Sequence, residues 1–196
     1  MNANVTVHSK TFGAAVGRRG VLAAGVVAAL SAAPAAAQVS GRMILQRGMS
    51  GGGLAQLEGG DDPRLANFGL FASAVQLPEG TTLVLGAIQW LEAGTDLQLE
   101  SIEVVRCVPI PNRSDGAQIS GRMRVNGEGD YPFVIRAYDG GRPGSALDRI
   151  EVEVNTDAAR DLAASDVSDD GFRYEAIGTL VAGDLQWIIA DIDTAG

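Results

Sequence analysis

Residues 119–139 decide the fold, and they read ISGRMRVNGEGDYPFVIRAYD. Two runs that alternate apolar and polar side chains flank the turn-forming residues 126–130, which is the pattern of a β-hairpin. If Val125 lies opposite Tyr131, every large apolar side chain of the hairpin falls on one face. A slip of one residue would turn one run over and expose half of these side chains, so the pattern also predicts a register.

The face of this hairpin away from the core carries side chains that could bind a ligand. They are Arg122, Arg124, Arg136 and Tyr138. Guanidinium groups match carboxylates in a two-pronged geometry, which indicates a site for an anionic ligand such as an acidic polysaccharide. The alternative is ion pairing with Glu151 and Glu153, which point outward from the next extended segment. Sequential strands usually neighbour each other, and this favours the ion pairs.

The remainder of the chain also reads as short extended segments separated by Gly, Pro and Asp. Expected strands cover 40–47, 65–76, 82–92, 97–108 and 147–155, and a last hairpin joins 172–181 to 184–193 around Ala182-Gly183. Residues 49–53 read as a flexible glycine stretch, and 156–162 as one helical turn capped by Thr156 or Asp157. The pattern predicts an all-β fold, an antiparallel two-sheet sandwich or barrel-like sandwich of about nine or ten strands.

The first 37 residues are typical of a secretory signal peptide. The pair Arg18-Arg19 precedes an apolar stretch over 21–33, and Ala35-Ala36-Ala37 supplies a small-x-small cleavage site. The apolar stretch is shorter than the roughly 20 residues of a membrane span, although an uncleaved anchor is the alternative. The arginine pair resembles a twin-arginine signal, with ordinary Sec export left open. We therefore expect a signal peptide over 1–37 and one secreted, periplasmic or envelope domain over 38–196, with no membrane span in the mature chain.

Composition excludes several classes of function for the mature chain. Its 12 arginines and 24 acids give a formal charge of −12, and it contains neither Lys nor His. Such an acidic chain is not expected to bind nucleic acid. Without His it has no Ser-His-Asp or Cys-His catalysis within the chain, and no Cys/His zinc site. Cys107 is the only cysteine, which we expect to be a buried apolar residue, with a reactive thiol or an interchain disulfide as alternatives.

One acidic stretch has the spacing of a calcium loop. Asp166, Ser168 and Asp170 place oxygen side chains at alternate positions, and Gly171 follows. The closing glutamate of such loops is missing, because that position is Ile177. The sequence thus predicts no cofactor other than optional calcium, and a solvated acidic turn is the alternative. A second Gly-rich loop, bracketed by Asp139 and Asp148, could bring two carboxylates together as ligands, but a turn in which Asp bonds its own backbone is favoured.

The turns have a familiar pattern in three places. The stretches are VNG with YPF (125–127 and 131–133), DGGRPG with DRI (139–144 and 148–150), and GTL with GDLQ (178–180 and 183–186). Together they resemble a Gly-rich all-β domain of secreted bacterial proteins. The resemblance covers most of the mature chain and implies the fold rather than a chemistry, and it implies no catalytic residue.

These observations predict a non-catalytic extracellular or envelope module that binds a partner or supports structure. The expected partner is a polysaccharide or an envelope protein. Trp90 and Trp187 lie in apolar runs, which indicates core positions rather than a sugar-stacking platform. The alternative is a small hydrolase of polysaccharide that uses two carboxylates and no histidine.

Overall fold

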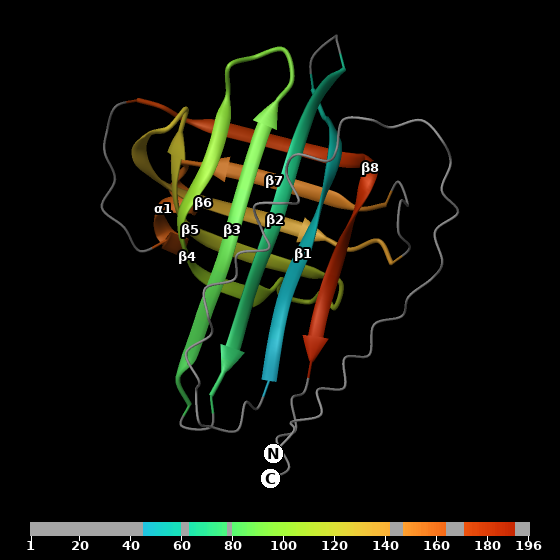
Figure 1. The fold of residues 1–196 in the computed structure, drawn as a ribbon, viewed down its shortest axis with the longest axis vertical. Helices are drawn as coiled ribbons and strands as arrows, with labels where there is room; N and C mark the ends of the chain where they lie inside the picture. Colours follow the sequence, from blue (N-terminus) through green and yellow to red (C-terminus); the bar gives the residue numbers. More distant parts are fainter. Residues whose placement is uncertain (1–44, 60–62, 78–79, 142–146, 164–170, 191–196) are drawn as a thin grey trace, which may run out of the picture.

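Eight antiparallel strands form a closed barrel in which every strand pairs with its neighbours in sequence and β8 returns to β1 (Figure 1). The computed structural model describes residues 45–59, 63–77, 80–141, 147–163 and 171–190. The predicted signal peptide, residues 1–37, lies outside them. The strands are β1 (Leu45–Leu57), β2 (Arg64–Gln76), β3 (Thr82–Glu92), β4 (Gln98–Pro109), β5 (Gly116–Val125), β6 (Glu128–Tyr138), β7 (Arg149–Val154) and β8 (Tyr174–Ala190).

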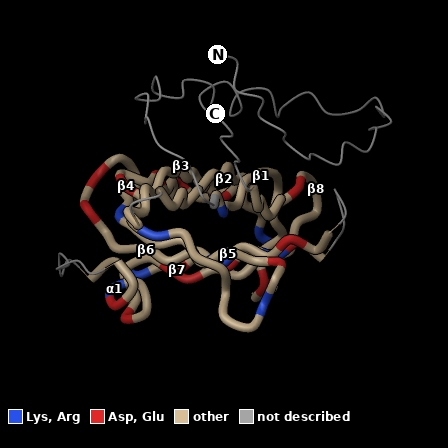
Figure 2. Tube along the Cα trace, turned by 90° about the horizontal axis from the view of Figure 1, so that it is seen from below, with Lys and Arg blue, Asp and Glu red and all other residues tan. Residues whose placement is uncertain are grey.

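The barrel is flattened, with β1–β3 forming one wall and β5–β7 the other, and the strands of the two walls cross steeply (Figures 1 and 2). The 17-residue strand β8 joins the walls. It pairs with β7 over Tyr174–Thr179 and with β1 over Gly178–Ala190. The all-β prediction is confirmed. Within the described residues the sheet closes into one barrel of eight strands, where a two-sheet sandwich or barrel-like sandwich of nine or ten strands was expected.

Inward side chains from all eight strands fill the barrel. The largest fully buried ones are Trp90, Phe133, Met49, Leu70, Leu99, Ile119, Met123, Ile135, Ile150, Leu185, Val134 and Val152. All but Val134 belong to the barrel core. Trp90 is therefore a core residue, as predicted, and Trp187 packs against the same core. Burial of this apolar surface is the main force that holds the walls together.

The central hairpin faces the core as predicted, but its turn is tighter. Asn126 and Gly127 alone form the turn, with φ of 54° and 81°, so β6 already begins at Glu128. Met123 consequently lies opposite Tyr131, two residues from the predicted register. An even shift leaves the same side chains inward, because successive side chains alternate between the faces of a strand.

Two glycine-rich segments differ from the expectation. The stretch predicted to be flexible, residues 49–53, lies within β1, and the predicted hairpin at Ala182-Gly183 lies within β8. Where these strands pair, Gly53 faces Gly183, and the register shifts by one residue so that Val181 bulges out. A Cβ on either glycine would overlap a carbonyl oxygen of the opposite strand. The glycines therefore permit close approach of two strands rather than a turn.

A short helix, α1 (Asp157–Ala163), covers the outer side of β5 and β6. Its N-cap is Thr156, whose Oγ1 accepts a 3.1 Å hydrogen bond from the Ala159 amide, as the sequence predicted. The Ser120 hydroxyl donates to the Leu162 carbonyl, and Val134 is fully buried on this outer face. No helix in the described part of the chain has the length and apolar character of a membrane span.

Candidate functional site on the outer face of strands 6 to 8

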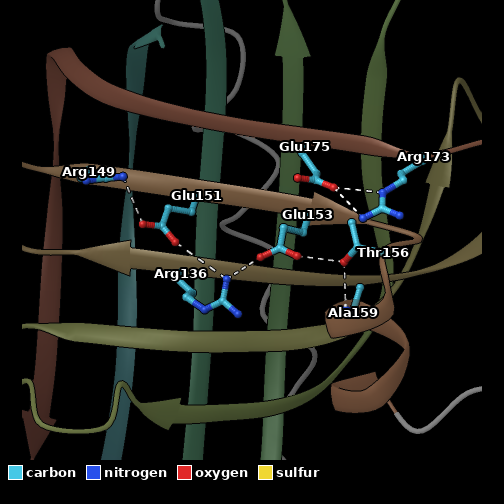
Figure 3. Close-up of polar contacts among 8 residues, drawn as sticks. All are labelled: Arg136, Arg149, Glu151, Glu153, Thr156, Ala159, Arg173 and Glu175. Carbon is cyan, nitrogen blue, oxygen red and sulfur yellow. Dashed lines mark hydrogen bonds and ion pairs between the residues drawn. The ribbon is translucent and has the colours of Figure 1, made fainter. Parts of the chain in front are cut away.

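Arg136 lies at the centre of a row of ion pairs on the outer face of β6 and β7 (Figure 3). Its Nη1 lies 2.5 Å from Oε1 of Glu153 and 3.7 Å from Oε2 of Glu151. Arg149 extends the row, with Nη2 3.4 Å from Oε1 of Glu151. The predicted cross-strand pairing is confirmed for Arg136. It follows from the register, which sets Arg136 opposite Glu151.

The row of ion pairs ends at the helix cap. Oε2 of Glu153 accepts a 2.8 Å hydrogen bond from the Thr156 hydroxyl, whose oxygen in turn caps α1 at Ala159 (Figure 3). Glu153 therefore holds both a guanidinium group and the capping residue. The contacts with Arg136 and Thr156 fix the Glu153 side chain, so Glu153 has a structural role that requires no ligand.

The other two arginines of the predicted anion site lie apart from this row. The Nε of Arg122 donates to Asp130 at 2.7 Å, and Nη2 of Arg122 contacts the other oxygen of the same carboxylate. Arg124 is exposed and faces Glu100 across the strands, but forms no ion pair with any residue that the structure describes. Two of the three arginines thus already have carboxylate partners, and Arg124 alone presents an open guanidinium.

Tyr138, the aromatic member of the predicted site, also has partners within the chain. The guanidinium carbon of Arg113 lies 4.8 Å from the centre of its ring, a cation–π contact. Burial raises the pKa of the Tyr138 hydroxyl, and the charge and hydrogen bond of Glu151 raise it further. Its ring and its hydroxyl are therefore both engaged, and little of the side chain is left for a sugar ligand.

A depression of about 430 Å³ lies beside the row of ion pairs, over β7 and β8. Its polar lining is four glutamates, namely Glu58, Glu151, Glu153 and Glu175. Glu175 pairs with Arg173 at 2.9 Å. The sequence showed outward glutamates on 147–155, but it did not show that the end of β1 brings Glu58 to them, because that contact depends on barrel closure.

The two aspartates around the loop between β6 and β7 bind main chain. The carboxylate of Asp139 accepts hydrogen bonds from the backbone amides of Gly141 and Trp187. The carboxylate of Asp148 accepts hydrogen bonds from the backbone amides of Gly140 and Leu185. Burial raises the pKa of Asp148, while the Leu185 and Gly140 amides oppose that shift. The turn interpretation is confirmed, and the pair also ties this loop to β8.

A buried carboxylate that the sequence did not reveal lies inside the barrel. Glu92 is 2% exposed, and its two oxygens accept from Arg64 at 3.1 Å and from the Tyr174 hydroxyl at 2.9 Å. The indole of Trp90 donates to the same hydroxyl at 3.0 Å. Burial and the neighbouring Glu92 raise the pKa of Tyr174 well above its usual value. The alternation of β3 placed Glu92 on the inward side, which is the signal that could have found it.

Cys107 is buried, as expected, and its thiol lies 3.7 Å from the Ala72 carbonyl. Burial raises its pKa to about 11, although a backbone contact with Met49 opposes this. Because the thiolate is the nucleophile, we expect no alkylation by iodoacetamide at pH 8 in the folded protein and full alkylation in denaturant, measured by mass spectrometry.

The raised pKa of Cys107 also predicts that the protein becomes less stable at high pH. The folded state keeps the thiol proton after the unfolded chain has lost it, so the stability supplied by Cys107 is present below about pH 9 and is lost as pH rises through about 11. Rapid alkylation of the folded protein at pH 8 would contradict this assignment.

The calcium residues Asp166, Ser168 and Asp170 lie outside the described residues. Elsewhere, in the ranges that the structure describes, no group of three or more His, Cys, Asp or Glu side chains could hold a metal ion.

Calcium binding at 166–170 stays a prediction, and thermal melting tests it. A ligand that binds only the folded state raises the melting temperature. Calcium should therefore raise the melting temperature relative to chelator, and equal melting in both would rule the site out.

The chain matches no family model, no curated protein and no solved structure.

Proposed function

We propose that this chain acts after export as a non-catalytic β-barrel module, which binds or supports a polysaccharide or an envelope protein. One observation carries the proposal. Within the described residues, the two buried acids, Glu92 and Asp148, are fully engaged by hydrogen-bond donors of the barrel. Polar groups that are buried and satisfied in this way stabilise a fold, whereas acid–base catalysis needs a carboxyl group that faces its substrate.

Export rests on the sequence of residues 1–37, and it predicts where the mature chain begins. Cell fractionation should recover the protein outside the cytoplasm, with an amino terminus at or within a few residues of Gln38. A product that stays in the cytoplasm and retains Met1 would refute export.

The anionic ligand proposed for Arg122, Arg124, Arg136 and Tyr138 now depends mainly on Arg124. This residue is exposed and has no ion-pair partner in the described part of the chain, so it is the guanidinium most available to an acidic sugar. Binding to acidic polysaccharides should therefore weaken in Arg124→Ala. The control is Arg173→Ala, which removes an exposed arginine that already pairs with Glu175 and lies away from these four residues. Equal binding by both variants and the parent would exclude the site.

The rival function, a polysaccharide hydrolase, is favoured by the depression lined with four glutamates. Such enzymes need one carboxyl group that delivers a proton and a second that acts as nucleophile or base. Three of the four glutamates already have arginine partners, because Glu151 and Glu153 both contact Arg136 and Glu175 contacts Arg173. This arrangement favours a structural role for these glutamates over proton delivery.

A further inference from the structure

The outer face of β8, β1, β2 and β3 is almost free of charge. The register aligns these strands in rows, for example Ile188, Gly48, Ser73 and Leu85. The outward positions are 46, 48, 50, 52 and 54 in β1, 67, 69, 71, 73 and 75 in β2, 83, 85, 87, 89 and 91 in β3, and 182, 184, 186, 188 and 190 in β8. Asp184 is the single charged residue among these positions. We call them the uncharged face.

Large apolar side chains stand exposed at one side of the uncharged face. Leu83, Leu85 and Leu91 alternate along β3 and are 41%, 57% and 49% exposed. Across the face, Ile188 is partly buried and Phe71 lies between. Exposed leucines that share one strand and have uncharged neighbours on an isolated molecule are typical of an interaction site.

We propose that the uncharged face is the contact surface of a symmetric dimer of this chain. The proposal does not depend on export or on the proposed function. It follows from the size of the face, from its charge and from its self-complementary layout.

The size of the face suits a stable dimer. Strands lie about 4.8 Å apart and outward residues repeat about every 6.7 Å, so each outward residue covers roughly 30 Å² of sheet. About twenty outward positions therefore cover roughly 600 Å² per copy and about 1,200 Å² in a pair. Specific interfaces begin near 1,200 Å² of total buried surface, so a contact over the whole face reaches the lower limit for a specific dimer.

Of the two walls, charge favours this one for contact between two copies of the chain. The chain has a formal charge of −9, so two copies repel each other wherever their acids meet. The opposite wall carries the ion pairs of β6 and β7 and is partly covered by α1. In Figure 2 the wall of β1–β3 is drawn mostly without charge. Two copies that meet through the uncharged face bury few charged groups, and interface cores are depleted of charge in the same way.

The layout of the face matches itself under a twofold rotation. A twofold axis parallel to the strands places β3 of one copy over β8 and β1 of the other, and the reverse contact follows by symmetry. By the strand registers, Leu85 would then lie against Ile188 and Leu83 against Ala190, and Gly48, which has no side chain, leaves room beside Leu85. Each copy supplies both halves of the contact, which is what a closed dimer requires.

The test is the mass of the processed chain in solution, measured by sedimentation equilibrium over a range of concentrations. We expect a dimer that dissociates on dilution. Leu85→Arg should weaken association at least 100-fold, because it places a guanidinium against Ile188 of the other copy, in the apolar part of the contact. The matched control is Leu147→Arg, since Leu147 is 72% exposed and lies outside the uncharged face.

Thermal melting confirms that both variants are folded, and the milder Leu83→Gln with Leu85→Gln replaces Leu85→Arg if that variant fails to fold. A parent chain that stays monomeric at the highest concentrations would overturn the proposal. A dimeric parent would also overturn it if Leu85→Arg and the double glutamine variant both dimerise as tightly as the Leu147→Arg control. Monomers would also result if another segment of this chain or a different partner covers the face, and that outcome equally excludes the dimer.

Discussion

Gly183→Ala is expected to destabilise the barrel by at least about 3 kcal/mol, the size of effect seen when a substitution combines backbone strain with overpacking. Gly183 has φ of 101°, a conformation that alanine adopts only under strain, and a Cβ there would overlap the Gly52 carbonyl of the paired strand. Because this contact closes the barrel between β8 and β1, the strands must move apart to admit a methyl group. Urea denaturation measures the loss.

Gly94→Ala is the matched control for this prediction. Gly94 also has a positive φ, 81°, but a Cβ there would meet nothing within 4 Å. Gly94→Ala should lower the free energy of unfolding by only about 1–2 kcal/mol, which is the cost of the left-handed backbone conformation alone. Equal losses in the two variants would mean that close strand approach at Gly183 contributes nothing.

Asp148→Ala is expected to destabilise the protein by about 2–4 kcal/mol, because each unsatisfied buried donor costs roughly 1–3 kcal/mol. Asp148 is 1% exposed, and its carboxylate accepts from the Gly140 amide at 2.8 Å and the Leu185 amide at 2.9 Å. Truncation leaves both amides without that acceptor and detaches the loop before β7 from β8. The loss is measured by urea denaturation.

Asp115→Ala is the control for Asp148, since Asp115 is an exposed aspartate in an ion pair with Arg113. Exposed pairs contribute about 0–1 kcal/mol, so this variant should melt close to the parent. If Asp148→Ala were as mild as Asp115→Ala, the carboxylate would not hold β8 to the loop, and a ligand role for Asp148 would have to be reconsidered.

Alternation of side chains was enough to predict the local structure of the central hairpin. The inward face, the pairing of Arg136 with Glu151 and the Thr156 cap all depend on neighbours that are close in sequence. The glycine segments were misread for a physical reason. Glycine supports both a turn and a close approach of strands, and only the partner strand, distant in sequence, distinguishes the two.

Barrel closure also explains which parts of the candidate site the sequence could not predict. The depression needs Glu58 at the end of β1 beside Glu175 of β8, and these residues meet only because the last strand returns to the first. The buried Glu92 of β3 reaches the Tyr174 hydroxyl of β8 across the interior of the closed barrel. In both cases the residue types were visible in the sequence, but the contact depends on strands that are distant in sequence.

We propose that the acids of this barrel hold its structure together and perform no chemistry. The decisive measurement is of the reducing ends released from neutral and acidic polysaccharides during long incubation with the mature chain. We predict no release above buffer and no difference between the parent chain and its Glu153→Gln variant. Release that grows with time and enzyme concentration, and that Glu153→Gln or Glu175→Gln abolishes in a folded protein, would contradict the claim and establish a hydrolase.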